Sequence, residues 1–413
     1  MAGAVTWTGN GARRGNDDGE RAPFDQIARG ATREVRERDL ERDRWLGYDA
    51  AVSTQQHPNA GDDAAGLAGG ASDAIASTSS TPPSAASTSS APSPARRSRL
   101  RRWLRRGAVA AALTLAAFVA LVEVYGARDA TRALLAGREA LGSSSTARVP
   151  ADDRAERAAD ALLVDAELVG DGDLVVRVRL RLPPGDGPHP VVVVMGGQRT
   201  GRRVVDLVEP TRPVALLGLD YPYTKPDPKP KGLGPNAREG LVIHAAVWDV
   251  VPAAMLAFDW IETRDDLDAS RIALVGGSLG ALFAPAIAAH DERVAAVGLL
   301  LGAGDLGGLV AANLKAPWPL PHLAGWLASS LVAPLEPLDH IAAIAPRPVL
   351  FVAGEGDERM PRALSEKLIE RCGDPKEVRW LDLGHVNVRD PEFHTQVLGE
   401  VVAWFDRVGV LGE

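Results

Sequence analysis

From about residue 162 onward, the sequence predicts an α/β fold whose sheet is mostly parallel. Short runs that are apolar at every position alternate with longer Ala/Leu-rich segments of helical pattern. Strands that are apolar on both sides are typical of parallel sheets, because helices cover both faces. The apolar runs are 191–195, 214–219, 272–276, 294–301, 349–353 and 378–383, and the helical segments are 247–262, 279–290, 362–371 and 393–408.

The run at 174–182 has a different pattern from the other predicted strands. Its sequence, LVVRVRLRL, places apolar residues and arginines at alternating positions. Such alternation is typical of an antiparallel strand with one buried face and one face in water. We therefore expect the N-terminal edge of the sheet to be antiparallel.

The N-terminal part of the chain has a composition that does not support a folded core. No aromatic residue occurs between Tyr48 and Trp103, and Ala, Ser, Thr, Gly and Pro dominate this stretch. A segment of this kind buries too little apolar surface to offset its chain entropy. Residues 1–95 are therefore predicted to be disordered.

Composition also excludes some classes of function. The net charge of −8 argues against a nucleic-acid-binding protein. The single cysteine, Cys372, excludes an internal disulfide framework and any cysteine-based zinc site.

Residues 96–126 have the pattern of a membrane anchor. Seven arginines between Arg96 and Arg106 precede the segment 107–125, whose one charged residue is Glu123. This segment is close to the length of about 20 residues that a helix needs to cross a bilayer. A buried core helix is the alternative, but core helices are rarely apolar on every face. We expect residues 107–125 to contact lipid and residues 127–160 to form a linker.

The distribution of charge predicts the orientation of this anchor. Arginines are concentrated on the N-terminal side, whereas the C-terminal side carries mixed charges. The positive-inside rule then places the N-terminus in the cytoplasm and the C-terminal domain on the other side of the membrane.

A Gly-X-Ser-X-Gly motif follows one of the predicted buried strands. Gly276, Ser278 and Gly280 form this motif in RIALVGGSLG, and an Ala-rich helix follows directly. A strand, a sharp turn and a helix are the context in which this motif presents a nucleophilic serine. Ser278 is therefore the candidate nucleophile, with Gly276 and Gly280 allowing close packing around it.

A nucleophilic serine needs a base, and the base needs an acid to orient it. Asp357 lies in the loop after the strand 349–353, and His385 follows the strand 378–383. These two residues are the candidate acid and base. Asp305, which follows an earlier strand, remains an alternative acid, as do the neighbours Glu355 and Glu358. The other histidines considered, His290, His340 and His394, lie in or beside helical patterns, and Asp382 is expected to be structural.

The order serine, acid, histidine, each after a strand, is that of the α/β hydrolases. Residues 161–410 resemble this superfamily, and are most similar to its dienelactone-hydrolase-like and bacterial acyl-esterase branch. The resemblance implies a sheet covered by helices on both faces and a small helical cap, which we expect at residues 306–339. Serine at position 278 argues against the branches that use a cysteine or aspartate nucleophile.

An oxyanion hole for such a serine requires two backbone N–H donors. The resemblance implies that Leu279 supplies one donor and that Gln198, in the loop after the strand 191–195, supplies the other. Many hydrolases have a His-Gly-X sequence in this loop, whereas this chain has Gly196-Gly197-Gln198. The missing histidine does not remove the donor, because the donor is a backbone amide.

The sequence thus predicts a membrane-anchored serine hydrolase that cleaves a small carboxylic ester or thioester through an acyl-enzyme on Ser278. No metal and no organic cofactor is implied. A serine peptidase, an acyltransferase and a non-catalytic binding domain on a hydrolase scaffold remain alternatives. The acyl group, the leaving group and the oligomeric state are not determined by the sequence.

Overall fold

The computed structural model describes residues 94–126, 134, 146–148, 157–158, 161–170, 174–197, 200–208, 210, 212–223, 232–385 and 391–412. Residues 1–93 of the predicted disordered region, and most of the predicted linker 127–160, lie outside this range. Of the described residues, 94–118 belong to one compact unit and 119–412 to another.

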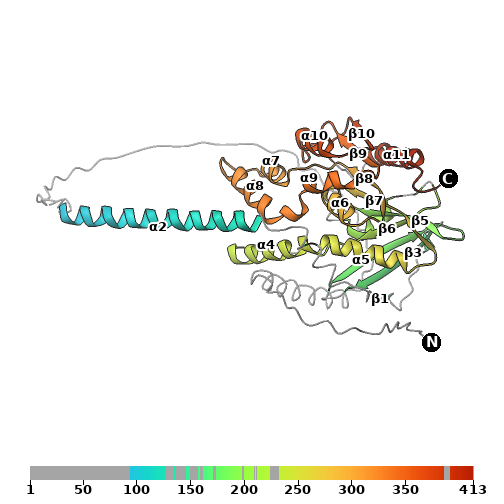
Figure 1. Cartoon of the computed structure of the whole chain (residues 1–413), viewed down its shortest axis with the longest axis horizontal. Helices are drawn as coiled ribbons and strands as arrows, with labels where there is room; N and C mark the ends of the chain where they lie inside the picture. Colours follow the sequence, from blue (N-terminus) through green and yellow to red (C-terminus); the bar gives the residue numbers. More distant parts are fainter. Residues whose placement is uncertain are drawn as a thin grey trace, which may run out of the picture. The chain divides into compact units, whose positions relative to one another are not determined.

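Helix α2 (Pro94–Gly126) contains the predicted membrane anchor (Figure 1). Its segment Arg105–Gly126 is long and apolar enough to cross a bilayer. Apolar side chains along it, including Leu113, Leu115 and Leu121, are exposed. The alternative of a buried core helix therefore does not describe α2.

The C-terminal domain is built on a mixed sheet, which among the described residues has ten strands in the order β1-β3-β4-β6-β5-β7-β8-β9-β10, with β2 paired to β3 (Figure 1). The strands are β1 (Thr146–Arg148), β2 (Arg157–Ala158), β3 (Ala161–Val169), β4 (Val175–Leu182), β5 (His189–Met195), β6 (Ala215–Leu219), β7 (Leu267–Gly277), β8 (Val294–Leu300), β9 (Val349–Gly354) and β10 (Lys376–Leu381). From β6 to β10 all neighbours are parallel. The predicted α/β class is confirmed.

The antiparallel edge is wider than the sequence pattern indicated. Strand β4 pairs antiparallel with β6 on one side and with β3 on the other, so it is not the outermost strand. The arginines on the more exposed face of β4 find partners across this pairing: Arg179 lies opposite Asp165 and forms an ion pair with it at 2.6 Å. Arg177 and Glu167 form a second such pair at 3.0 Å. Strands β1 and β2 lie within the segment predicted as a linker and add to the same edge.

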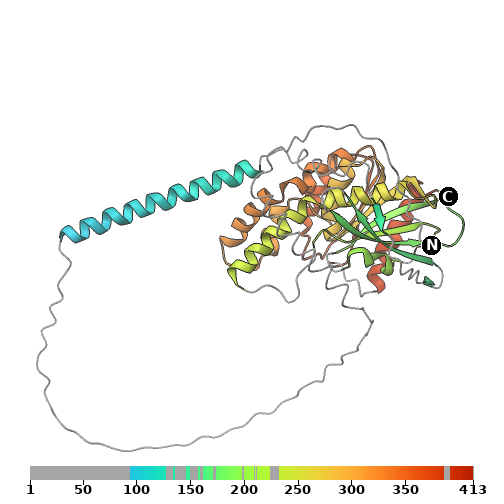
Figure 2. The ribbon, with the colours of Figure 1, turned by 90° about the horizontal axis from the view of Figure 1, so that it is seen from below.

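Helices cover both faces of the sheet (Figures 1 and 2). They are α4 (Leu233–Trp248), α5 (Val250–Glu262), α6 (Leu279–His290), α7 (Leu306–Asn313), α8 (Leu320–Leu331), α9 (Pro337–His340), α10 (Arg362–Arg371) and α11 (Pro391–Val408), with the short 3-10 helices η1 (Gly201–Leu207), η2 (Ala333–Leu335) and η3 (Ile341–Ile344). Because side chains of a strand alternate between faces, β5 contributes to two cores. Val191, Val193 and Met195 pack with α5 and α6. Val192 and Val194 pack on the opposite face with α11 and η1.

Candidate active site

Ser278 lies at a sharp turn between β7 and α6, as the motif predicts. Its φ is 52°, a left-handed value that is strained for a residue with a side chain. Its backbone N–H donates to the carbonyl of Leu300 on β8 at 2.9 Å. A Cβ at Gly276 would lie 2.5 Å from the carbonyl carbon of Gly280, and one at Gly280 would collide with Met195. The two glycines therefore permit the close packing that holds this turn.

Three side chains from separate loops meet at the carboxyl ends of the strands. The Oγ of Ser278 lies 2.8 Å from Nε2 of His385. The Nδ1 of His385 lies 2.9 Å from Oδ2 of Asp357 and 3.0 Å from its Oδ1. A histidine that donates from Nδ1 to a carboxylate presents an unprotonated Nε2 to the serine hydroxyl. The arrangement can therefore remove a proton from Ser278 and return it to a leaving group.

Asp357 is held in place by the loop that carries it. Its side chain is buried, and its Oδ1 accepts hydrogen bonds from the backbone N–H groups of Arg359 and Met360, each at 2.9 Å. These contacts fix the carboxylate before any substrate arrives.

The alternative acid, Asp305, makes contacts of a structural kind. It caps α7 by accepting from the N–H of Gly308 at 2.8 Å, and it pairs with Lys367 at 2.6 Å. The hydrogen bond from Lys367 lowers the pKa of Asp305. Glu355, Glu358 and Asp382 are exposed. Asp357 is the carboxylate that contacts His385.

The region expected to bind an oxyanion lies beside Ser278. Leu279 is the first residue of α6, and the first amides of a helix have no partner within it. Gly196 and Gly197 line the same cavity as Ser278. Gln198, the predicted second donor, lies outside the described residues.

Two residues to which the sequence assigned no role in the site hold the loop after β5. The hydroxyl of Tyr221 donates to the carbonyl of Gly196 at 2.5 Å, and the hydroxyl of Thr200 donates to the carbonyl of Gly197 at 2.8 Å. Burial raises the pKa of Tyr221. Thr200 lies three residues after Gly197, so its contact is local. Tyr221 follows β6 and reaches Gly196 from there, so no pattern within the loop reveals it.

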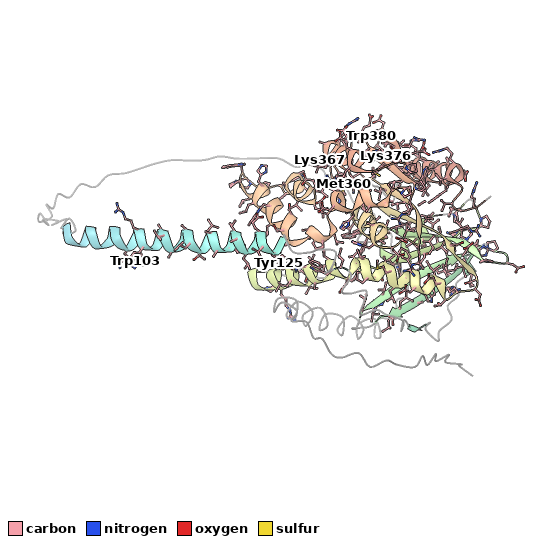
Figure 3. All side chains as sticks on the ribbon, in the orientation of Figure 1. Trp103, Tyr125, Met360, Lys367, Lys376 and Trp380 are labelled. Atoms are coloured by element: carbon pink, nitrogen blue, oxygen red, sulfur yellow. The ribbon has the colours of Figure 1, made fainter. Side chains whose placement is uncertain are left out.

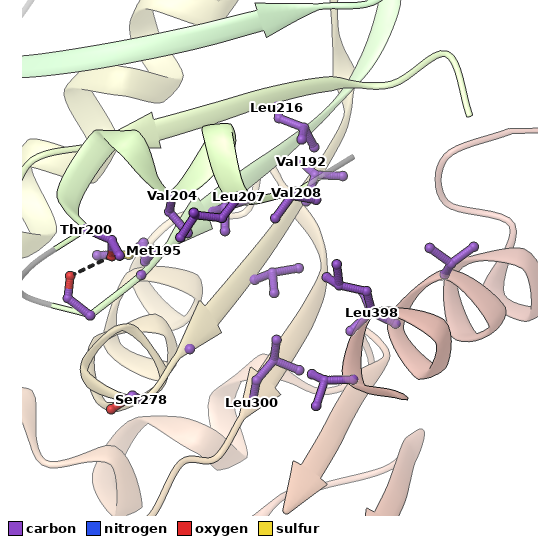
Figure 4. Close-up of a pocket in the computed structure, with 18 of the residues that line it drawn as sticks. Val192, Met195, Thr200, Val204, Leu207, Val208, Leu216, Ser278, Leu300 and Leu398 are labelled. Carbon is purple, nitrogen blue, oxygen red and sulfur yellow. Dashed lines mark hydrogen bonds between the residues drawn. The ribbon is translucent and has the colours of Figure 1, made fainter. Parts of the chain in front are cut away.

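A cavity of about 1010 Å³ opens at this site (Figure 4). Ser278, His385, Glu358 and Arg359 line one part of it, and the remaining lining is mostly valine and leucine from β5, β6, η1 and α11. The segment expected to form a cap, 306–339, contains helices α7 and α8, as a cap would. Among the described residues, however, none of this segment lines the cavity. The role of that segment as a cap stays a prediction.

Two further observations concern other chemistry. Within the described ranges, no group of three or more His, Cys, Asp or Glu side chains is placed to hold a metal ion. Cys372 is buried at the end of α10, and burial raises the pKa of its thiol to about 11. A thiol of this kind is a poor nucleophile at neutral pH.

Comparison with known sequences gives distant relatives of unknown function. No protein-family model matches the chain. An uncharacterized protein of Mycobacterium tuberculosis strain CDC 1551 is 29% identical over 210 residues, which is 50% of this chain and 65% of the relative. An uncharacterized protein of strain H37Rv of the same organism matches equally well. The match thus spans less than two thirds of the length of these relatives.

Comparison with solved structures shows the fold. Acetyl xylan esterase 1 from Thermoanaerobacterium sp. JW/SL YS485 superposes with a TM-score of 0.51 and 13% identity, over 66% of this chain and 92% of that one. An acetyl xylan esterase from Paenibacillus sp. R4 has a TM-score of 0.49 and 18% identity, over 66% and 94%. The chain has the α/β-hydrolase fold, which confirms the resemblance drawn from the sequence.

Proposed function

We propose that this chain is a serine hydrolase that cleaves a carboxylic ester or thioester through an acyl-enzyme on Ser278. One observation carries the proposal: the Oγ of Ser278 lies 2.8 Å from Nε2 of His385, whose Nδ1 lies 2.9 Å from Asp357. The strained turn at Ser278 supports it, because strain of this kind is retained at functional sites.

The geometry supports a two-step reaction. The Oγ of Ser278 attacks the carbonyl carbon of the substrate while Nε2 of His385 takes the hydroxyl proton. The carbonyl oxygen becomes an oxyanion, which the N–H of Leu279 and a donor from the loop after β5 stabilise. His385 then gives its proton to the departing alcohol or thiol. A water molecule gives a proton to His385 and attacks the acyl-enzyme. His385 returns that proton to the Oγ of Ser278 as the bond between Oγ and the acyl carbon breaks and the acid leaves.

The fold alone does not determine the reaction. A direct test is to label the full-length chain with a fluorophosphonate probe and to map the adduct by mass spectrometry. We expect one adduct, on Ser278. Ser278→Ala should abolish it, and His385→Ala should slow it strongly. Ser270→Ala, which changes an exposed serine near the opposite end of β7, should leave it unchanged.

An unlabelled but folded wild-type chain would contradict the proposal and favour a non-catalytic binding domain. If Ser278 is labelled, product analysis with competing acceptors separates hydrolysis from acyl transfer. A screen of ester, thioester and peptide substrates then separates esterase from peptidase activity.

We also propose that α2 anchors the hydrolase domain to a membrane in a single pass. Its apolar segment, its exposed side chains and the preceding arginines support this. The charge asymmetry favours an N-terminus in the cytoplasm and a hydrolase domain on the other side. Protease protection of the domain in sealed cells would test the orientation, because a domain digested only after lysis of the cytoplasmic membrane would contradict it.

Contacts at the C-terminal end of α2 support an attachment close to the bilayer. The indole N–H of Trp326 on α8 donates to the carboxylate of Glu123 at 2.8 Å. Tyr125, labelled in Figure 3, makes a hydrogen bond with the ring of His244 on α4. Beside these contacts, the segment 306–335 carries one charged residue, Lys315. Trp318, Leu320 and Leu323 in this segment are exposed, and exposed tryptophan is typical of a membrane interface.

A further inference from the structure

The cavity at Ser278 extends far beyond the space that the reaction itself needs. Its volume of about 1010 Å³ is at the upper limit of small-molecule sites, which span about 300–1,000 Å³. The triad occupies one end, so most of the cavity is available to one part of a substrate. The side chains that line the cavity indicate the chemical nature of that part of the substrate.

The walls are apolar along the length of the cavity. The sheet contributes Val192 and Val194 from β5, Leu216 from β6, Val275 from β7 and Leu300 from β8. Helix α11 contributes Leu398 and four more apolar side chains, and the region of η1 contributes three further valine and leucine side chains. Figure 4 shows Leu398 across the cavity from Val192 and Leu300. A cavity lined in this way holds water poorly and hydrocarbon well.

Strand register gives the direction of the cavity. Val192 pairs with Leu216 on β6 and with Ala273 on β7. Ala273 lies five residues before Ser278 in the sequence, which corresponds to roughly 16 Å along a strand. The cavity therefore runs from the catalytic serine back under the sheet, along the face that carries Val192 and Val194.

The charged side chain at the end of the cavity remote from Ser278 already has partners within the protein. Arg212 lines the cavity there, forms an ion pair with Asp406 and donates to the carbonyl of Gly412 at 3.2 Å. A ligand whose far end is uncharged hydrocarbon therefore suits this region. A charged end would be buried without an opposite charge to pair with, because Arg212 is already paired.

The sequence of the covering elements explains why the space exists. After β5 the chain forms the seven-residue 3-10 helix η1, a short element, and α11 covers the neighbouring part of the same face. Val192, Val194 and Leu216 thus line a space between η1 and α11.

From this geometry we infer that the cavity is an acyl channel, which binds the medium or long hydrocarbon chain of a fatty acyl ester or thioester. The inference rests on the proposed function, since the channel receives the acyl group that Ser278 accepts. It names the substrate class that the sequence left open: lipid-like acyl esters, in place of acetyl esters.

The first test is the chain-length dependence of hydrolysis. The full-length chain, kept in amphipol so that no free detergent competes for the channel, is assayed with acetyl, butyryl, octanoyl, dodecanoyl and hexadecanoyl esters of p-nitrophenol. We expect kcat/KM to rise by about fourfold per added methylene until the channel is filled. If kcat/KM for the acetyl ester equals that for the longer esters, the inference is overturned and the proposed function stands.

A matched pair of variants locates the effect in the channel. Leu398→Trp should lower kcat/KM for the dodecanoyl ester by roughly tenfold to a hundredfold while leaving the acetyl ester unchanged. Gly399→Trp places the same side chain at the next position of α11, where a Cβ meets open space, and should leave both esters unchanged. Equal loss of both esters in Leu398→Trp, or the same loss in Gly399→Trp, would contradict the assignment.

A binding measurement keeps the inference independent of catalysis. In the Ser278→Ala background, decanoate and palmitate should raise Tm, since a ligand of the native state stabilises it. Acetate should not, and adding Leu398→Trp should remove the effect. If fatty acids bind in this way but no ester is cleaved and no probe labels Ser278, the channel stands and the proposed function fails. If no fatty acid binds, the channel inference is wrong.

Discussion

The hydroxyl of Ser278 and the imidazole of His385 lie within hydrogen-bond distance, 2.8 Å, although 107 positions separate them in the chain. The contact forms because β7 and β10 end at the same edge of a parallel arrangement. Loops at the carboxyl ends of such strands bring distant residues together. The predictions below begin with this pair and the groups that support it.

Replacing the carboxylate that orients His385 should reduce activity without unfolding the protein. In Asp357→Asn, Oδ1 can still accept from Arg359 and Met360, but the amide favours the wrong tautomer of His385. We expect kcat to fall by about 10⁴. Asp305→Asn is the control and should keep wild-type kcat. Both values come from steady-state kinetics. A large loss of kcat in Asp305→Asn, with wild-type kcat in Asp357→Asn, would make Asp305 the acid.

Removing the hydroxyl of Tyr221 should weaken catalysis through the loop after β5. Tyr221→Phe loses the hydrogen bond to the carbonyl of Gly196 and keeps the partly buried ring. The loss of one such bond, about 1 kcal/mol, corresponds to a decrease of roughly fivefold in kcat with little change in KM. A rise in KM at constant kcat would assign Tyr221 to substrate binding.

The thiol of Cys372 should be inert in the folded protein. Burial raises its pKa to about 11, so almost none is thiolate at pH 8. We expect slow reaction with Ellman's reagent at pH 8, and fast reaction once the chain is unfolded in guanidinium. Fast labelling of the native chain would contradict the burial of this residue.

Asp305 should contribute stability in a pH-dependent manner. Asp305→Ala loses the cap of α7 and the partner of Lys367, and we expect the free energy of unfolding to fall by about 1 kcal/mol at pH 7. The pKa of Asp305 is lowered in the folded state, so its contribution is present above the unfolded value of about 3.9. It is lost as the pH falls through the folded pKa. Denaturant titrations should show the difference between variant and wild type shrinking in acid.

A charge in the middle of α2 should release the protein from membranes. Leu115→Arg places a guanidinium in the apolar segment, at a cost of about 3 kcal/mol for insertion. We expect more protein in the fraction extracted by alkaline carbonate. Trp103→Arg, in the arginine-rich part before the segment, is the control and should stay with the membranes. Extraction of the wild-type chain under these conditions would contradict the anchor.

The sequence by itself determined the α/β class and the positions of Ser278, Asp357 and His385 at the ends of strands. These features were predictable because they are local: a buried strand followed by a glycine turn, or by a loop with an acid, is visible within ten residues. The order of strands in the sheet, which only the structure shows, brings these three side chains together, with 2.9 Å between Nδ1 of His385 and Oδ2 of Asp357. The catalytic roles stay predictions until Ser278 is labelled.

Only the tertiary structure decided the features that depend on elements far apart in the chain. Strand β3 lies outside β4, and its Asp165 and Glu167 face arginines across the ladder, which no pattern within β4 alone reveals. Tyr221 reaches Gly196 because β5 and β6 are neighbours in the sheet. The channel between Val192 and Leu398 exists because a short 3-10 helix and α11 leave part of one face unfilled. Whether side chains fill the space between a sheet and its covering helices depends on how elements distant in the sequence pack together. The periodicity of apolar residues along the chain does not reveal it.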